Sequence, residues 1–205
     1  MYRYHTRTLL ILCMWGEDVV KKYFRVMFVI LAILSFAACS PTQVPTDSPS
    51  KVPTDEEVKL AYQQATEAYS WFDLTTMNFD ANSEIEYNGN IYMKVNQEGI
   101  QSLSDLEAYL RNLFSEDIVD SLLETNRYID IDGVLYAMPA DRGTNIFAGE
   151  EHHKIIRESD KKIIYEVTVD ILDDNLEKAV DEEVYSFSYE FIEDKWVFTN
   201  FSLVR

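Results

Sequence analysis

Apolar residues recur at helical spacing in the segment that follows Pro53. The apolar positions are Val58, Ala61, Tyr62, Ala65, Ala68, Tyr69 and Phe72. Steps of three and four residues place these side chains on one face of a helix. Thr54 and Glu57 have the spacing of a capping box, in which each side chain binds the other residue's backbone N–H. The pattern predicts a helix over residues 54–73 that buries an aromatic stripe.

Two shorter helices are predicted next. Ser104 and Glu107 form a second capping-box pattern. The apolar positions of the helix after it are Leu106, Tyr109, Leu110, Leu113 and Phe114. We expect Ser115 to cap a further short helix that carries Ile118, Val119, Leu122 and Leu123.

Two dipeptides predict β-hairpins. Asn88-Gly89 lies between two short apolar runs, and Asp132-Gly133 separates residues 128–131 from residues 134–136. A two-residue hairpin turn favours positive φ, which Asn, Asp and Gly adopt most readily.

The last third of the chain alternates apolar and polar residues. We expect three long strands, over residues 161–171, 183–193 and 195–203. Their apolar faces carry Ile163, Tyr165, Val167, Val169 and Ile171 in the first strand, and Tyr185, Phe187, Tyr189 and Phe191 in the second. A period of two indicates one buried and one solvated face. The predicted class is α+β, with N-terminal helices packed on a curved antiparallel β-sheet.

Composition and charge narrow the classes of function. Hydrophobic residues make up 47% of the 205 residues, so a core can form, and the formal net charge is −18. This charge repels phosphates, so we expect no nucleic acid partner. Two cysteines cannot make a disulfide framework.

Residues 1–38 have the pattern of an export signal. The apolar run over residues 26–38 is too short to span a bilayer, which needs about 20 residues, but it suits the core of a signal peptide. Lys21, Lys22 and Arg25 precede it. Glu17 and Asp18 lie where basic residues are expected, so we place the true translation start near residue 19 or 20, with residues 1–18 as an extension.

Ala37-Ala38-Cys39 at the end of this run resembles the lipobox of bacterial lipoproteins. The resemblance implies that Cys39 is lipidated and anchors the mature protein to the membrane. The alternative is an ordinary signal peptide with an incidental cysteine. Residues 39–53 are rich in Pro, Ser and Thr, which is typical of a solvated tether, and residues 54–205 form the folded domain.

Few side chains suit catalysis or metal binding. His152 and His153 lie beside two glutamates, but neighbouring residues of a strand point to opposite faces, so we interpret residues 149–154 as a charged surface loop. The acidic run from Asp170 to Glu177 lacks the spacing of a calcium loop. The sequence has no nucleophile elbow and no Gly-rich phosphate loop. We therefore expect no catalytic residue, metal site or cofactor.

The segment between the second hairpin and the long strands is the candidate binding element. Its residues are Pro139, Ala140, Asp141, Arg142, Gly143, Thr144 and Asn145. Pro139 fixes φ, and we expect Gly143 to adopt a conformation that other residues disfavour. Loops held by a rigid sheet often carry binding function. The alternative is a plain crossover loop.

The order and spacing of several motifs resemble the IseA family of secreted D,L-endopeptidase inhibitors of Firmicutes. The motifs are Ala61-Tyr62, Ala68-Tyr69-Ser70-Trp71-Phe72, Tyr92-Met93-Lys94-Val95, residues 104–110, Phe114-Ser115, Leu122-Leu123, residues 131–136 and Asp141-Arg142-Gly143. The resemblance runs from Val58 to the end of the chain. It implies a curved, two-part sheet and a non-enzymatic inhibitor.

In that family a loop between the two parts of the sheet blocks the active-site cleft of NlpC-type cysteine peptidases that cut peptidoglycan. The matching inhibitory loop here is residues 139–145, and the implied partner is a cell-wall D,L-endopeptidase. With Cys39 lipidated, the protein is expected outside the cytoplasm, held at the membrane and facing the cell wall.

Two other functions stay open at this point. One is a cone-shaped, nuclear-transport-factor-like domain that binds a ligand or dimerises through its curved sheet. The other is a metal-dependent enzyme around His152. The acidic turn over residues 173–177 is a second candidate binding surface.

Overall fold

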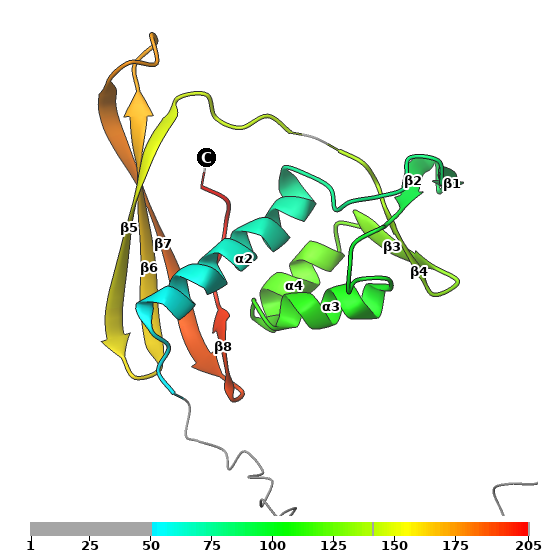
Figure 1. Ribbon diagram of the computed structural model, residues 1–205, viewed down its shortest axis with the longest axis horizontal. Coiled ribbons are helices and arrows are strands. Elements are labelled where there is room, and N and C mark those ends of the chain that lie inside the picture. The colour runs from blue at the N-terminus through cyan, green and yellow to red at the C-terminus, as the bar shows by residue number, and fades with distance from the viewer. Residues whose placement is uncertain (1–50, 141, 205) are drawn as a thin grey trace, which may run out of the picture. The chain divides into compact units, whose positions relative to one another are not determined.

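The computed structural model describes residues 51–140 and 142–204 (Figure 1). The first elements are α2 (Asp55–Asp73), β1 (Ile85–Tyr87), β2 (Asn90–Lys94), α3 (Leu103–Arg111), α4 (Glu116–Leu123), β3 (Tyr128–Ile131) and β4 (Val134–Ala137). Then follow β5 (Ala148–Ser159), β6 (Lys162–Leu172), β7 (Ala179–Ile192) and β8 (Lys195–Phe198). The predicted export signal, Cys39 and the part of the predicted tether before position 51 lie outside the described residues.

The strands form two antiparallel sheets. The smaller sheet has the order β1-β2-β4-β3, and the larger, strongly curled sheet has the order β5-β6-β7-β8. Helices α2, α3 and α4 lie between the sheets, with α2 along one face of the larger sheet (Figure 1). This arrangement confirms the α+β class with helices packed on a two-part antiparallel sheet.

Helix α2 begins and ends where its pattern predicts. The Thr54 backbone N–H donates to Glu57 Oε2 at 2.7 Å, and the Glu57 backbone N–H donates to Thr54 Oγ1 at 3.2 Å. These two bonds satisfy donors that the first turn of a helix leaves without partners. The capping box is therefore confirmed, and α2 ends at Asp73.

The capping box predicted for α3 is wrong by two residues. Ser102, and not Ser104, is the N-cap, and Asp105 takes the place of Glu107 as its partner. The Asp105 carboxylate accepts from the backbone N–H groups of Gln101, at 3.1 Å, and Ser102, at 2.9 Å. A short Asp side chain suffices for this reciprocal contact, so the helix starts before the Ser–Glu pair. Ser115 is the N-cap of α4, but its side chain makes no capping hydrogen bond.

Both predicted hairpin turns are confirmed. Asn88 and Gly89 have φ of 50° and 78°, and Asp132 and Gly133 have φ of 53° and 79°. Positive φ at both central residues is the backbone of a type I′ turn, whose twist matches that of the strands it joins.

Our interpretation of residues 149–154 as a charged surface loop is wrong, because these residues belong to strand β5. Residues 148–159 pair with β6 as an edge strand. Much of this strand is exposed, so charged side chains are tolerated and no clean alternation remains in the sequence. The last predicted strand is also too long, since β8 ends at Phe198.

The two edges of the larger sheet differ. Beside β8, the Ser115 N–H donates to the Phe198 carbonyl at 2.9 Å, and the Phe198 N–H donates to the Leu113 carbonyl at 2.8 Å. The connection between α3 and α4 therefore covers this edge. Strand β5, at the other edge, pairs only with β6 within the described sheets.

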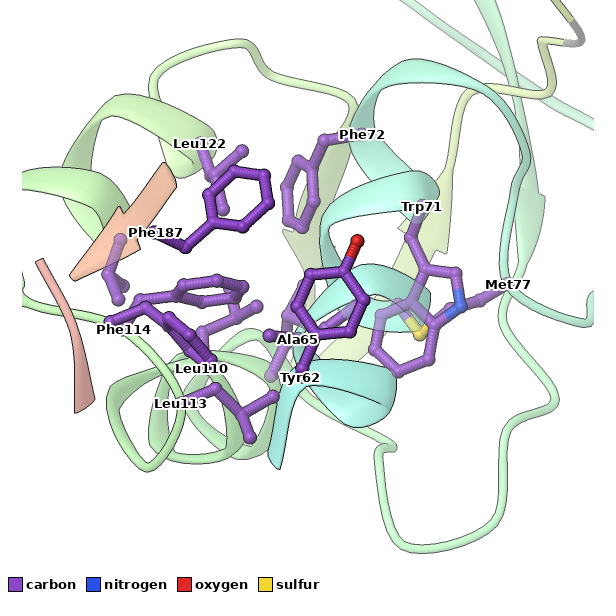
Figure 2. Packing of buried hydrophobic residues seen from close by; sticks show 14 of the residues in the cluster. Tyr62, Ala65, Trp71, Phe72, Met77, Leu110, Leu113, Phe114, Leu122 and Phe187 are labelled. Carbon is purple, nitrogen blue, oxygen red and sulfur yellow. The ribbon is translucent and has the colours of Figure 1, made fainter. Parts of the chain in front are cut away.

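One core joins the helices to both sheets. Tyr62 and Phe72 of α2 pack with Leu110 of α3, Leu122 of α4 and Phe187 of β7 (Figure 2). The cluster also takes in Leu135 of the smaller sheet. Most apolar positions predicted for α2, β6 and β7 belong to this core or pack against it, whereas Ile171 and Phe191 are not part of it. The two sheets are thus parts of a single hydrophobic unit.

Candidate functional site

The candidate loop connects the two sheets (Figure 1). It leaves the smaller sheet at Ala137 and enters the larger sheet at Ala148. Ala140 and residues 142–146 are exposed, and Ile146 shows 67% of its surface. Asp141 lies outside the described residues. The loop therefore presents side chains to solvent between its two ends.

A buried arginine holds the first end of the loop. The Arg127 Nη2 atom donates to the Ala140 carbonyl at 2.6 Å, the Thr75 carbonyl at 2.7 Å and the Thr76 hydroxyl at 3.0 Å. Arg127 is 8% exposed and is the one buried polar or charged residue among those described. A buried charge is costly unless hydrogen bonds compensate it, so these bonds fix Ala140 to the segment after α2.

Backbone contacts reinforce this end. The Ala140 N–H donates to the Thr76 hydroxyl at 3.1 Å, and the Met138 N–H donates to the Arg127 carbonyl at 2.8 Å. The Arg142 N–H donates to the Leu74 carbonyl at 3.0 Å. The loop from Met138 to Arg142 thus follows the end of α2.

The Arg142 side chain combines an ion pair with exposure. Its Nη1 atom lies 3.2 Å from Asp73 Oδ1, yet 66% of the side chain is exposed. Arg carries five N–H donors in a planar fork, so one contact with Asp73 leaves donors that face solvent. The side chain is therefore oriented and still able to bind.

The second end of the loop forms a local turn. Asn145 Oδ1 accepts from the Phe147 N–H at 3.0 Å, and the Leu172 N–H donates to the Phe147 carbonyl at 2.8 Å. An Asn side chain that binds the backbone two residues on mimics a backbone turn.

The expectation for Gly143 is wrong. Its φ lies outside the left-handed region, and a Cβ atom at this position would meet no atom within 4 Å. The open surroundings of the loop remove the need for a glycine backbone here. The structure therefore gives no reason for a side chain at Gly143 to distort the loop.

The two histidines lie on opposite faces of β5. His152 has a side chain that is 56% exposed, whereas His153 Nδ1 lies 3.3 Å from the Tyr165 hydroxyl and its ring packs at the edge of Tyr62. In the part of the chain that the structure describes, no three His, Cys, Asp or Glu side chains are grouped to hold a metal ion.

The acidic turn between β6 and β7 binds its own backbone. Asp173 Oδ1 accepts from the Glu177 N–H at 3.0 Å, which lowers the pKa of Asp173. This local hydrogen bond is sufficient to explain why an aspartate stands at the start of the turn, and no bound ligand is needed to explain it.

Sequence reasoning missed Arg127 as a functional residue. The available signal was an arginine directly before the strand over residues 128–131, in a strongly acidic chain. Its partners Thr75 and Ala140 lie 52 and 13 residues away in the sequence, so no local spacing rule reveals the contact.

Comparisons with known proteins identify one family. A family model described as IseA DL-endopeptidase inhibitor matches residues 50–202. None of the curated proteins compared with the chain matches it. Within residues 51–140 and 142–204, no helix has both the length and the apolar character needed to cross a membrane.

Proposed function

Because the chain belongs to the IseA family of DL-endopeptidase inhibitors, we propose that it blocks the active-site cleft of an NlpC-type endopeptidase with residues 139–145. The family assignment confirms the resemblance of the sequence motifs, and it makes an endopeptidase the protein's partner. The insertion of the loop into the cleft, without any reaction catalysed by this protein, is the proposed mechanism.

The observation that carries this proposal is an exposed loop with fixed ends. Arg127 holds Ala140 at one end, and the turn at Asn145 joins the other end to β6. A segment that is ordered before binding loses less conformational entropy when it enters a cleft. The same arrangement presents Arg142, whose guanidinium can donate to carboxylates or carbonyls of the partner.

Stereochemistry supports the role of an uncut inhibitor. A D,L-endopeptidase cuts a bond between residues of opposite chirality, whereas this loop consists of L-residues and one glycine. The loop can therefore fill the cleft while its peptide bonds lack the configuration of the substrate.

The decisive test is Arg142→Ala against a purified NlpC-type endopeptidase. We expect the inhibition constant to rise about 5- to 150-fold, which is the range of 1–3 kcal/mol for an interface anchor. The melting temperature should change little, because the Arg142 side chain lies mostly outside the core. The measurements are inhibition constants and melting curves.

Arg157→Ala is the matched control. Arg157 of β5 also pairs with an aspartate, at 2.6 Å from Asp55 Oδ1 at the start of α2, and it is not part of the loop. The Arg157→Ala variant should therefore inhibit the endopeptidase as strongly as the unchanged protein does. Equal inhibition by both variants would place the binding surface elsewhere, with the turn over residues 173–177 as the next candidate.

The proposed place of action is the outer side of the cell membrane. The lipobox-like Ala37-Ala38-Cys39 supports a lipid anchor, and the tether over residues 39–53 supports reach towards the cell wall. Cys39→Ala should release the protein from membranes or leave it unprocessed, which cell fractionation measures. Fully processed protein that stays with the membrane would contradict the anchor.

A further inference from the structure

A groove of about 830 Å³ runs between α2 and the edge strand β5. Lys59, Tyr62 and Glu67 of α2 line it together with Glu151 and His153 of β5 and Tyr165 of β6. None of its lining residues belongs to the candidate loop. A volume of this size is typical of a site for a small ligand.

Two contacts fix the direction of the groove. At the start of α2, the Arg157 Nη2 atom donates to Asp55 Oδ1 at 2.6 Å. One to two turns further along α2, the Tyr62 ring lies 5.9 Å from the His153 ring. Helix α2 therefore runs antiparallel to β5. This direction places Glu67 and Glu151 at the same end of the groove.

The two ends of the groove carry opposite charges. Lys59 is exposed at one end, and Glu67 and Glu151 line the other, where Glu151 Oε2 also lies 3.4 Å from His153 Nε2. Eight residues separate Lys59 from Glu67, which is about 12 Å along a helix. An extended peptide spans this distance with about three or four residues.

The floor between the charged ends is aromatic. The Tyr62 and Tyr165 rings stack with centroids 4.3 Å apart, and the His153 ring lies 5.7 Å from Tyr165. Burial raises the pKa of Tyr62 to about 12, so its hydroxyl stays neutral at physiological pH. Tyr62 is 7% exposed and Tyr165 is 3% exposed, so the floor offers ring edges to the middle of a ligand.

We propose that this groove binds a short peptide of three or four residues with a free amine and a free carboxylate. The carboxylate lies at Lys59, and the ammonium group lies at Glu67 and Glu151. Charge complementarity at both ends and the aromatic floor select this class of ligand. The site is separate from the inhibitory loop and does not depend on the loop's function. Peptidoglycan stem-peptide fragments belong to this chemical class.

The test is a titration of the full chain with tetra-alanine in which backbone amide NMR shifts are measured at each peptide concentration. We expect saturable shifts at residues 59–67 and 151–153. Tetra-alanine with an acetylated amine and an amidated carboxylate should cause no such shifts, because it lacks both charges. Shifts that are equal for the capped peptide, or absent up to about 10 mM peptide, would overturn the proposal.

Variants locate the two charges. Lys59→Gln and Glu151→Gln should each raise the dissociation constant at least about fivefold, because each removes one charge partner of the ligand. Lys154→Gln is the matched control, since its exposed side chain lies on the opposite face of β5, beside Glu166. An equal loss of affinity in Lys154→Gln, or no loss in the two groove variants, would refute the proposed orientation.

A second peptide identifies the source of the ligand. Tighter binding of L-alanyl-γ-D-glutamyl-diaminopimelate than of tetra-alanine would assign the groove to peptidoglycan fragments, and equal binding would assign it to peptides in general. Both results support the site. Lys59→Gln should leave endopeptidase inhibition unchanged, so failure of the groove and failure of the loop are distinguishable.

Discussion

At the scale of single residues, Arg127 connects the interior to the candidate loop. One terminal nitrogen of its guanidinium contacts the Thr75 carbonyl, the Thr76 hydroxyl and the Ala140 carbonyl. The buried Nε atom of Arg127 has no hydrogen-bond partner among the described residues, so the contacts of the terminal nitrogen compensate for the burial of the charge.

Arg127→Ala should therefore destabilise the protein by about 2–4 kcal/mol, since two carbonyls lose a charged donor. We also expect weaker inhibition under conditions in which the variant stays folded, because Ala140 is no longer fixed. Urea denaturation and inhibition constants measure the two effects. Arg127→Lys keeps a positive charge but lacks the planar fork of donors. Its inhibition should therefore be stronger than that of Arg127→Ala and weaker than that of the unchanged protein.

Arg111→Ala is the control for this prediction. Arg111 contacts Glu107, Glu116 and Asp120, but these carboxylates are largely exposed to solvent. Surface ion pairs contribute little to folding stability, so we expect a smaller effect than for Arg127→Ala. A larger effect would contradict the importance given to burial.

At the scale of secondary-structure elements, the start of α3 distinguishes two serines with similar sequence patterns. Ser102→Ala should lower the free energy of unfolding by about 1 kcal/mol, because Ser102 Oγ accepts the Asp105 N–H at 3.1 Å. Ser104→Ala should have a much smaller effect, since Ser104 is not the N-cap. Thermal or urea unfolding of both variants checks the order.

The same cap has a pH signature. Hydrogen bonds from Ser102 and Gln101 lower the pKa of Asp105 below its usual 3.8. The contribution of the ionised carboxylate is complete above the pKa of the unfolded chain and is lost as the pH falls through the lower folded pKa. Ser102→Ala should therefore lose less stability than the unchanged protein when the pH is lowered below about 4. Identical pH profiles would contradict this coupling.

Elements with local signals could be predicted from the sequence. The Thr54–Glu57 cap and the Asn88-Gly89 turn depend on residues that are close in the chain, and both were predicted correctly. Strand β5 was missed because its exposed, charged side chains hide the alternation. The groove was beyond prediction as well, since it exists only where α2 lies along β5.

At the scale of the whole molecule, the net charge of −18 should control encounter with the partner. If the endopeptidase is basic, long-range attraction raises the association rate, and salt at 0.1 M screens this attraction beyond about 10 Å. Raising the salt concentration from about 50 to about 500 mM should therefore slow association strongly and change dissociation little.

Surface plasmon resonance with a purified endopeptidase separates the two rates. The dissociation rate serves as the internal control, because it reports the short-range contacts of the loop. An association rate independent of salt would contradict steering by the acidic surface.

The candidate loop is a place where the backbone can be cut between two halves of the domain. The loop is the chain connection between the half that ends with β4 and the half that begins with β5, while side chains from both halves share one core. Exposed loop segments are where proteases nick folded proteins. A cut near residue 143 would therefore yield two fragments that stay associated and unfold together. Such a nicked complex would keep its fold and lose the continuous backbone that the proposed inhibition needs.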